Sequence, residues 1–253
     1  MFNAVDEKNK IVKFIRDYFD KNNLGGVVIG ISGGKDSGVV AGLFSEAIGG
    51  ENIIGITLPC HSKSTDRSDA LLVSHKFGFE MLNIDLTEVY DKFKDQINLL
   101  GNFSEEELKN SDINIKPRLR MTSLYYIAAL YSALKGKTYI VAGTGNKCEE
   151  YVGYFTKGGD SVSDIKVLSD LTVDEVIKIG EVLGVPNEVL YKAPNDGLSG
   201  LTDEDKLEVK YSEIASYMNG EELDIEVKNK IEKLHNNSSH KFNIPTYRKS
   251  ENI

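Results

Sequence analysis

One short segment, a glycine-rich loop between an apolar run and the start of a helix, constrains the fold most. Residues 27–31 (VVIGI) are expected to form a buried strand, because the run is short, apolar, β-branched and bounded by glycines. Residues 32–37 (SGGKDS) follow, and the apolar stretch 39–44 continues as a helix. Glycines let a backbone approach a ligand with its N–H groups turned inward, and a helix N-terminus adds partial positive charge. The segment therefore predicts a phosphate-binding loop.

Two common phosphate loops do not match this segment. A Walker A loop would need a glycine where Ile29 stands and a hydroxyl side chain after Lys35, where Asp36 stands. The dinucleotide fingerprint GxGxxG would need its second glycine at Ser32. An acidic side chain beside phosphates is repulsive unless a cation intervenes, and Mg²⁺ binds one or two carboxylates together with phosphate oxygens. Asp36 is therefore expected to bind Mg²⁺.

Strands and helices alternate along the chain at short spacing. We expect further buried strands at 53–58, 80–86 and 139–143, a first helix that ends near Asn22, and helices at 64–77, 117–135 and 172–183. This order predicts an α/β, Rossmann-like fold, an open parallel sheet with right-handed crossovers and helices on both faces. We find no linker that would divide the chain, so one domain over residues 1–253 is expected.

Three stretches, 99–115, 145–166 and 193–206, lack a strong period and are rich in Gly, Asn, Asp and Ser. We expect them to be loops, which gather at the carboxyl ends of parallel strands, where ligands bind. The 193–206 loop is expected to cover the filled site as a lid. The polar tail, residues 236–253, is expected to be partly mobile until a ligand binds it.

Composition excludes several classes of function. The chain carries 30 basic and 39 acidic side chains, a net charge of −9, so it has no global basic surface for non-specific nucleic-acid binding. Its two cysteines, Cys60 and Cys148, are too few for a disulfide scaffold or a structural zinc site and fit a reducing compartment. The sequence has no run of 18 apolar residues and no apolar signal core, so we expect a cytoplasmic protein without a membrane span.

The SGGKDS loop resembles the pyrophosphate loop, SGGxDS, of the N-type ATP pyrophosphatases, which split ATP between its α and β phosphates. Four further runs, at 114–121, 143–149, 153–160 and 238–241, resemble the NAD synthetases in order and spacing. The resemblance implies the adenine nucleotide alpha hydrolase-like form of the α/β fold. It also implies a ligase that adenylates the nicotinate carboxylate of deamido-NAD with ATP and then uses ammonia to form NAD.

The same resemblance implies the partners and the nitrogen source. It implies a homodimer whose dinucleotide site lies at the subunit interface, with Mg²⁺ as the cofactor and ATP as a co-substrate. Some NAD synthetases carry an added glutaminase domain, for which this chain has no room. Free ammonia, or ammonia delivered by a separate protein, is therefore the expected nitrogen source.

Individual residues carry over from the motifs of the family. Those expected to bind ATP are Gly30, Ile31, Ser32, Gly33, Gly34, Lys35, Asp36, Ser37, Thr144 and Asn195. Those expected to bind deamido-NAD are Arg120, Lys157, Asp164, His240 and Lys241. Asp36 and Glu149 are expected to bind Mg²⁺, and Asp160 is expected to hold ammonium and help to deprotonate it. Val173 replaces a family lysine that contacts ATP, so phosphate binding is expected to weaken unless Lys35, Lys166 or another lysine supplies the charge.

Two other classes of function share some of these features. Another ATP pyrophosphatase, such as a GMP synthetase-like amidating enzyme or a tRNA thiolation enzyme, would have the same phosphate loop. The cysteines lack a thiolation motif, however, and the negative charge disfavours tRNA. A non-catalytic ATP-binding sensor would have the same type of sheet, but it would not need the second carboxylate, Glu149, or the cations Arg120 and Lys157.

Overall fold

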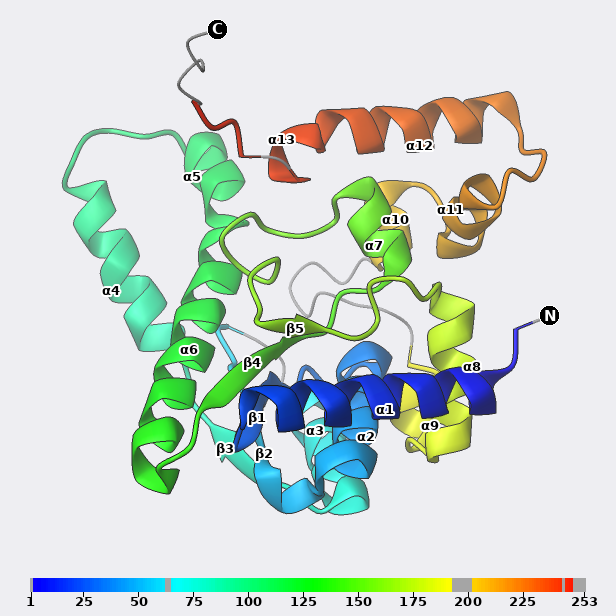
Figure 1. Cartoon of the computed structure of the whole chain (residues 1–253). Helices are drawn as coiled ribbons and strands as arrows, with labels where there is room; N and C mark the ends of the chain where they lie inside the picture. Colours follow the sequence, from blue (N-terminus) through cyan, green and yellow to red (C-terminus); the bar gives the residue numbers. More distant parts are fainter. Residues whose placement is uncertain (1, 62–64, 193–201, 243, 248–253) are drawn as a thin grey trace, which may run out of the picture.

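A five-stranded sheet is the centre of the structure. The computed structural model describes residues 2–61, 65–192, 202–242 and 244–247 (Figure 1). The strands are β1 (Gly26–Gly30), β2 (Ile53–Thr57), β3 (Glu80–Asn83), β4 (Tyr139–Gly143) and β5 (Ile165–Lys166). They are all parallel, in the order β3-β2-β1-β4-β5. The chain runs outward from β1 to β3 and returns beside β1 at β4. The strands β1 and β4 therefore flank the point where the strand order reverses, which is the usual ligand position in an open α/β sheet.

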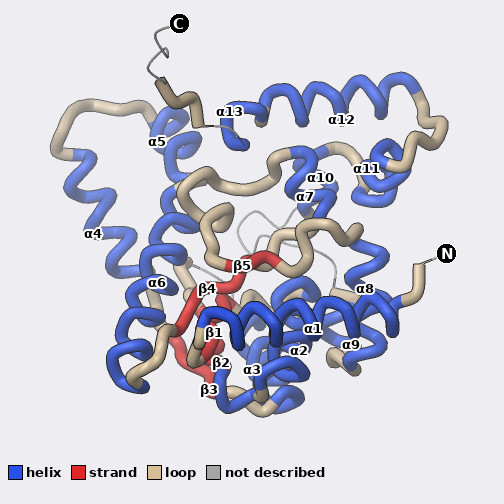
Figure 2. Tube along the Cα trace, viewed as in Figure 1, coloured by secondary structure: helices blue, strands red, loops and turns tan. Residues whose placement is uncertain are grey.

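Apolar side chains of the central strands point alternately into two cores. On β1, Val27 and Ile29 belong to one core and Val28 belongs to the other. The first core contains residues of α1 (Ala4–Asn22), α2 (Lys35–Ile48), α3 (Thr65–Phe77), α8 (Val173–Leu183) and α9 (Asn187–Leu190). The second contains residues of α4 (Thr87–Asn98) and α6 (Ile115–Lys135). The sheet is thus covered on both faces (Figure 2), which explains why its strands read as continuous apolar runs.

A third, smaller apolar cluster lies beyond the carboxyl end of β4. It joins α7 (Lys147–Val152), α10 (Asp203–Leu207), α11 (Tyr211–Met218) and α12 (Ile225–Asn237). The last described helix, α13 (Ser239–Phe242), follows α12 directly, and Figure 1 shows these helices gathered at one end of the molecule. Residues from the last third of the chain thereby reach the edge of the sheet where ligands are expected.

The expected α/β class is confirmed, and so are the strands at 27–31, 53–58 and 139–143, which match β1, β2 and β4 to within one residue at each end. The strand expected at 80–86 is shorter, because its ladder with β2 ends at Asn83. None of the described helices combines the length and the apolar character needed to cross a lipid bilayer.

The expectation of three loops was wrong in part. The stretch 99–115 contains α5 (Glu105–Asp112), and 145–166 contains α7 and β5. In the third stretch, 203–206 belongs to α10, whereas 193–201, and with it most of the expected lid, lies outside the described residues. Part of the polar tail forms α13. These elements are short and mostly polar, so they lack the apolar stripe that reveals a longer helix.

Candidate active site

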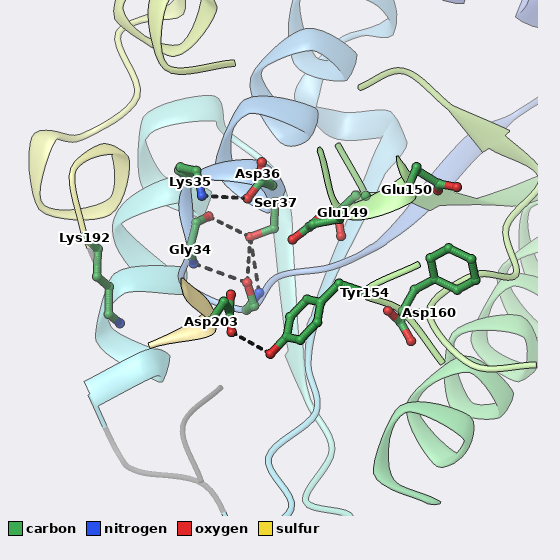
Figure 3. Close-up of a pocket in the computed structure, with 14 residues that line it drawn as sticks. Gly34, Lys35, Asp36, Ser37, Glu149, Glu150, Tyr154, Asp160, Lys192 and Asp203 are labelled. Atoms are coloured by element: carbon green, nitrogen blue, oxygen red, sulfur yellow. Dashed lines mark hydrogen bonds and ion pairs between the residues drawn. The ribbon is translucent and has the colours of Figure 1, made fainter. Parts of the chain in front are cut away.

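The phosphate loop joins β1 to α2 and is held in shape by two serines. Ser37 Oγ donates to the carbonyl of Gly34 at 3.0 Å and accepts from the N–H of Ser32 at 3.3 Å. Ser32 Oγ accepts from the N–H of Gly34 at 3.2 Å (Figure 3). Gly33 has a φ of +79°, a left-handed conformation that favours glycine. The glycines and serines of the motif thus form a closed turn directly before the N-terminus of α2.

The opposite wall is built from the segment that follows β4. Asn146 caps α7, because its Oδ1 accepts from the N–H groups of Cys148 at 3.0 Å and Glu149 at 3.1 Å. Glu149 reaches back, and its Oε2 accepts from the N–H of Asn146 at 3.0 Å. The same asparagine, which is fully buried, uses Nδ2 to donate to Asp36 Oδ1 at 3.3 Å. One side chain therefore connects both sides of the switch point.

Asp36 and Glu149 are the carboxylates that the sequence analysis assigned to Mg²⁺, and the structure brings them together. Burial and the nearby charge of Asp36 raise the pKa of Glu149 to about 8. The ammonium group of Lys35 lies 3.1 Å from Asp36 Oδ2 and is almost fully buried. Burial alone would lower the pKa of Lys35, but the charges of Asp36 and Glu149 outweigh it and raise that pKa. Two carboxylates in a partly dry pocket offer the hard oxygen ligands that Mg²⁺ prefers, so the residues fit this ion.

A cavity of about 250 Å³ opens between these walls (Figure 3). Its lining residues are Ser32, Gly34, Lys35, Asp36, Ser37, Thr144, Gly145, Glu149, Glu150, Tyr154, Phe155, Asp160, Lys192 and Asp203. The lining thus contains more carboxylates than lysines, which would repel the phosphates of ATP in the absence of a cation. Asp203 is held in place by Tyr154, whose hydroxyl donates to its Oδ1 at 3.0 Å.

Asp160 lies in the turn that the sequence analysis linked to ammonia, and it lines the cavity. Its Oδ1 accepts from the N–H of Thr156 at 2.8 Å. Although the residue is exposed, partial loss of water around its carboxylate raises its pKa, which makes it a better proton acceptor than an ordinary aspartate. Asp160 can therefore take part in proton transfer inside the cavity.

Val173 stands where the resemblance implies a lysine that contacts ATP. Val173 begins α8 and packs against the small apolar cluster, so it offers no substitute for a charge. Lys35 and Lys192 line the cavity, whereas Lys166 donates to Glu150 Oε1 at 2.5 Å. The ammonium group of Lys192 also donates to Asp69 Oδ2 at 2.6 Å, so part of its charge is neutralised by that carboxylate. Positive charge at this site thus comes from other lysines than the one expected from the resemblance.

The residues expected to bind deamido-NAD do not line this cavity and fall into two groups. Lys157 Nζ donates to the carbonyl of His240 at 2.7 Å, and Lys241 Nζ donates to the carbonyls of Gly153 at 2.6 Å and Phe155 at 2.8 Å. These three expected residues, Lys157, His240 and Lys241, therefore gather at one turn.

Arg120 and Asp164 lie elsewhere. Arg120 Nε donates to the carbonyl of Leu58 at 3.1 Å, just beyond β2. Asp164 accepts from the N–H of Val141 at 2.8 Å and from the hydroxyl of Tyr125 at 3.1 Å. Asn195, expected to contact ATP, lies outside the described residues.

Residues of α12 and α13, and Ser238 between them, donate hydrogen bonds to the C-terminal end of α7. The carbonyl of Tyr151 accepts from His235 Nδ1 at 2.7 Å, and the carbonyl of Val152 accepts from Ser238 Oγ at 3.0 Å. Together with the bonds of Lys241, these contacts satisfy carbonyl groups that a helix C-terminus leaves without partners. The helix α7, which Asn146 caps and which carries Glu149, is thereby fixed at both ends.

Sequence reasoning missed Asn146, Tyr154 and Asp203. The pattern Asn-x-x-Glu at 146–149 is a capping signature and could have placed the buried asparagine. Asp203 follows Thr202, which caps α10, but no local pattern predicts that α10 reaches a loop some 170 residues earlier in the chain.

Comparisons with known proteins agree with this arrangement. The model of the NAD synthase family matches residues 7–245. A curated NH₃-dependent NAD⁺ synthetase from Carboxydothermus hydrogenoformans is 36% identical over 244 residues, which are 96% of this chain and 97% of the relative. One from Methanocaldococcus jannaschii is 40% identical over 209 residues, 80% of this chain and 76% of the relative. The solved NMN synthetase from Francisella tularensis superposes with a TM-score of 0.87 at 33% identity and covers 98% of this chain and 99% of its own. The chain belongs to the NAD synthase family.

Proposed function

We propose that the chain is an ammonia-dependent NAD synthetase that uses ATP and Mg²⁺, and that its residues work as one domain. It adenylates the nicotinate carboxylate of deamido-NAD, releases pyrophosphate, and then lets ammonia displace AMP to give NAD. The observation that carries the proposal is the pairing of Asp36 with Glu149 beside the glycine-rich loop, at the switch point of the sheet. Curated relatives with this name, matched over nearly their whole length, support the acceptor and the nitrogen source.

The residues of the cavity would act by positioning and by charge rather than by covalent chemistry. N–H groups at the start of α2, together with Lys35, bind phosphate oxygens. Asp36 and Glu149 hold Mg²⁺, which when bound neutralises charge on the α-phosphate and on the leaving pyrophosphate. Asp160 accepts the proton that ammonium must lose before its nitrogen can attack, and its raised pKa suits that role.

A second acceptor is supported by the likeness to a solved NMN synthetase, at 33% identity over almost the whole chain. Amidation of the acid that corresponds to NMN would use the same ATP chemistry on the same nicotinate carboxylate. It would not need contacts to the adenylyl half of a dinucleotide. The two acceptors therefore differ in what the chain must bind beyond the cavity, and not in the residues of the cavity itself.

We also propose that the protein is a homodimer and that the outer face of α4 and α6 forms its interface. Large apolar side chains are exposed at four-residue spacing on both helices, namely Val89, Phe93 and Ile97 on α4 and Tyr126, Leu130 and Leu134 on α6. An extended apolar surface of this kind is typical of a protein interface, and a second copy is its simplest occupant. Analytical ultracentrifugation should give a dimer for the wild type and a monomer for Leu130→Glu. The control, Val5→Glu on α1, should stay dimeric.

The deciding experiment measures pyrophosphate, NAD and NMN formed by the purified chain with ATP and Mg²⁺. Deamido-NAD and nicotinate mononucleotide are offered separately, each with ammonium or with glutamine. NAD formed with ammonium alone is the expected result, and faster turnover of the mononucleotide would favour the second acceptor. Pyrophosphate release that requires a different acceptor would point to another ATP pyrophosphatase. ATP binding without pyrophosphate release under any of these conditions would leave the sensor as the better description.

A further inference from the structure

Tyr211 is a buried tyrosine directly behind the cavity. Its relative exposure is 3%, and it is the first residue of α11. Its N–H donates to Glu204 Oε1 at 2.8 Å, and its carbonyl lies 3.7 Å from Cys148 Sγ, on the helix that carries Glu149. The backbone of Tyr211 is thus anchored to α10 on one side and to α7 on the other, so its side chain has a fixed place in the third apolar cluster.

The hydroxyl of Tyr211 has no hydrogen-bond partner among the described residues, although it is shielded from solvent. Other tyrosine hydroxyls of the structure donate to carboxylates: Tyr125 to Asp164, Tyr131 to Glu80, Tyr154 to Asp203 and Tyr217 to Glu232. A buried hydroxyl without a partner is destabilising, because it gives up its bonds to water and gains none in return. Its presence on an otherwise apolar ring therefore calls for a hydrogen bond that forms when a ligand is bound.

The charges around this hydroxyl belong to the candidate active site. Burial raises the pKa of Tyr211, and the negative charges of Glu149, Asp203 and Asp36 raise it further. The Nζ of Lys35 lies 5.9 Å from the centre of the tyrosine ring. A hydroxyl that keeps its proton can act towards an ionised carboxylate only as a hydrogen-bond donor. Of the three carboxylates, Glu149 raises the pKa of Tyr211 most.

We propose that Tyr211 is a positioning residue for Glu149, whose carboxylate receives the tyrosine hydroxyl as a donor when the site holds Mg²⁺ with ATP. In the structure, Oε2 of Glu149 accepts the N–H of Asn146, and Oε1 accepts no hydrogen bond from the described residues. Carboxylates that bind a metal are commonly oriented by hydrogen bonds from an outer layer of groups. Tyr211 supplies such a donor from an anchored helix. The inference rests on the proposed use of Mg²⁺ and ATP, but it does not depend on which acid is amidated.

The test is Tyr211→Phe, which removes only the hydroxyl oxygen. Binding of Mg²⁺ is measured by calorimetry in the presence of α,β-methylene-ATP, which cannot be split between its α and β phosphates, and thermal melting is followed in parallel. We expect the dissociation constant for Mg²⁺ to rise about 10- to 100-fold, the usual effect of losing such an outer group. The Tm of the protein without ligand should stay the same or rise, because an unpartnered buried hydroxyl has been removed.

Tyr217→Phe, on the same helix, is the matched control. Its hydroxyl already donates to Glu232 at 3.0 Å, so its loss should lower the Tm and leave Mg²⁺ binding unchanged. Equal affinity of Tyr211→Phe and the wild type for Mg²⁺ would overturn the proposal, and so would a wild type that binds no Mg²⁺ with the analogue. If the wild type binds Mg²⁺ and the analogue but forms neither NAD nor NMN, the proposed function fails while the role of Tyr211 is still decided by the affinities.

Discussion

Asn146 Nδ2 donates a hydrogen bond of 3.3 Å to Oδ1 of Asp36, a residue 110 positions earlier in the chain. The bond crosses from the segment after β4 to the first turn of α2, the two sides of the point where the strand order reverses. Asn146 therefore does more than cap α7, because its Nδ2 also holds Asp36. The hydrogen bond between Asn146 and Asp36 sets the distance between the phosphate loop and α7, the helix that carries Glu149.

Removal of this asparagine should affect stability and metal binding together. Asn146→Ala takes away the cap of α7 and the amide donor to Oδ1 of Asp36, which should lower the free energy of unfolding by about 1–3 kcal/mol. Mg²⁺ binding should weaken as well. The control, Ser104→Ala, removes the cap of α5 and should cost about 1 kcal/mol without changing Mg²⁺ affinity. Urea unfolding and Mg²⁺ titration of both variants test this, and equal Mg²⁺ affinities would contradict it.

The charge of Asp36 should matter for turnover and not for folding. Asp36→Asn keeps the size of the side chain but removes a ligand of the proposed metal, so pyrophosphate release should fall about 100-fold or more. Its Tm without metal should change little, because relief of the repulsion between Asp36 and Glu149 offsets the loss of the negative charge beside Lys35. Asp17→Asn, at an exposed position of α1 that does not line the cavity, is the control that should leave turnover unchanged. A variant that releases pyrophosphate at nearly the wild-type rate would exclude the metal role of Asp36.

The fold and the phosphate loop could be predicted because their signals are local. The run from 27 to 48 combines a β-branched strand, a glycine turn and an apolar helix, and the structure keeps this order in β1 and α2. Glu149 could be placed because β4 and a short turn deliver it to the carboxyl end of the sheet. In contrast, β5 has only two residues, too few for any periodic pattern.

The rest of the site depends on contacts between distant segments. Asp203 and Tyr211 come near the loop only because α10 and α11 pack on α7, an arrangement that no local pattern encodes. Asn146 is an intermediate case. Its capping pattern predicts a helix start, but its bond to Asp36 depends on the order of the strands. The helix α5 was missed although Ser104 and Glu107 form a capping box, because its exposed, acidic sequence resembles a loop.

Metal binding and stability should depend on pH in opposite directions. Burial and Asp36 raise the pKa of Glu149 from 4.5 to about 8 in the folded protein. The folded state therefore holds more protons than the unfolded state between these values, so the metal-free free energy of unfolding should fall as the pH rises through this range. Mg²⁺ must displace the proton, so its affinity should rise by up to about tenfold per pH unit below 8.

Urea unfolding and Mg²⁺ titration between about pH 5 and pH 9 check both trends. Glu149→Gln cannot ionise, so the part of the stability slope that comes from this carboxyl group should disappear in that variant. A wild-type Mg²⁺ affinity that stays constant between about pH 6 and pH 8 would show that the Glu149 carboxyl is already ionised there.

Variants of Lys241 can show whether this residue positions the turn that carries Asp160 or contacts a substrate. The resemblance to NAD synthetases implies that it binds the dinucleotide, but its ammonium group donates to the carbonyls of Gly153 and Phe155 and lies 5.3 Å from the centre of the Phe155 ring. It thereby ties α13 to the turn that carries Asp160. Lys241→Met should lower the free energy of unfolding by about 2 kcal/mol and raise the KM for ammonium, because that turn loses its anchor.

Lys241→Arg can still donate to both carbonyls and should retain most of the stability and most of the affinity for ammonium. Lys233→Met, an exposed lysine on α12, should change either quantity little. A substrate contact alone predicts a different pattern, since the loss of the charge would raise the KM for deamido-NAD and leave both the Tm and the KM for ammonium at their wild-type values. Steady-state kinetics with each substrate varied in turn, together with thermal melting, distinguish the two roles, because only the positioning role couples stability to ammonium.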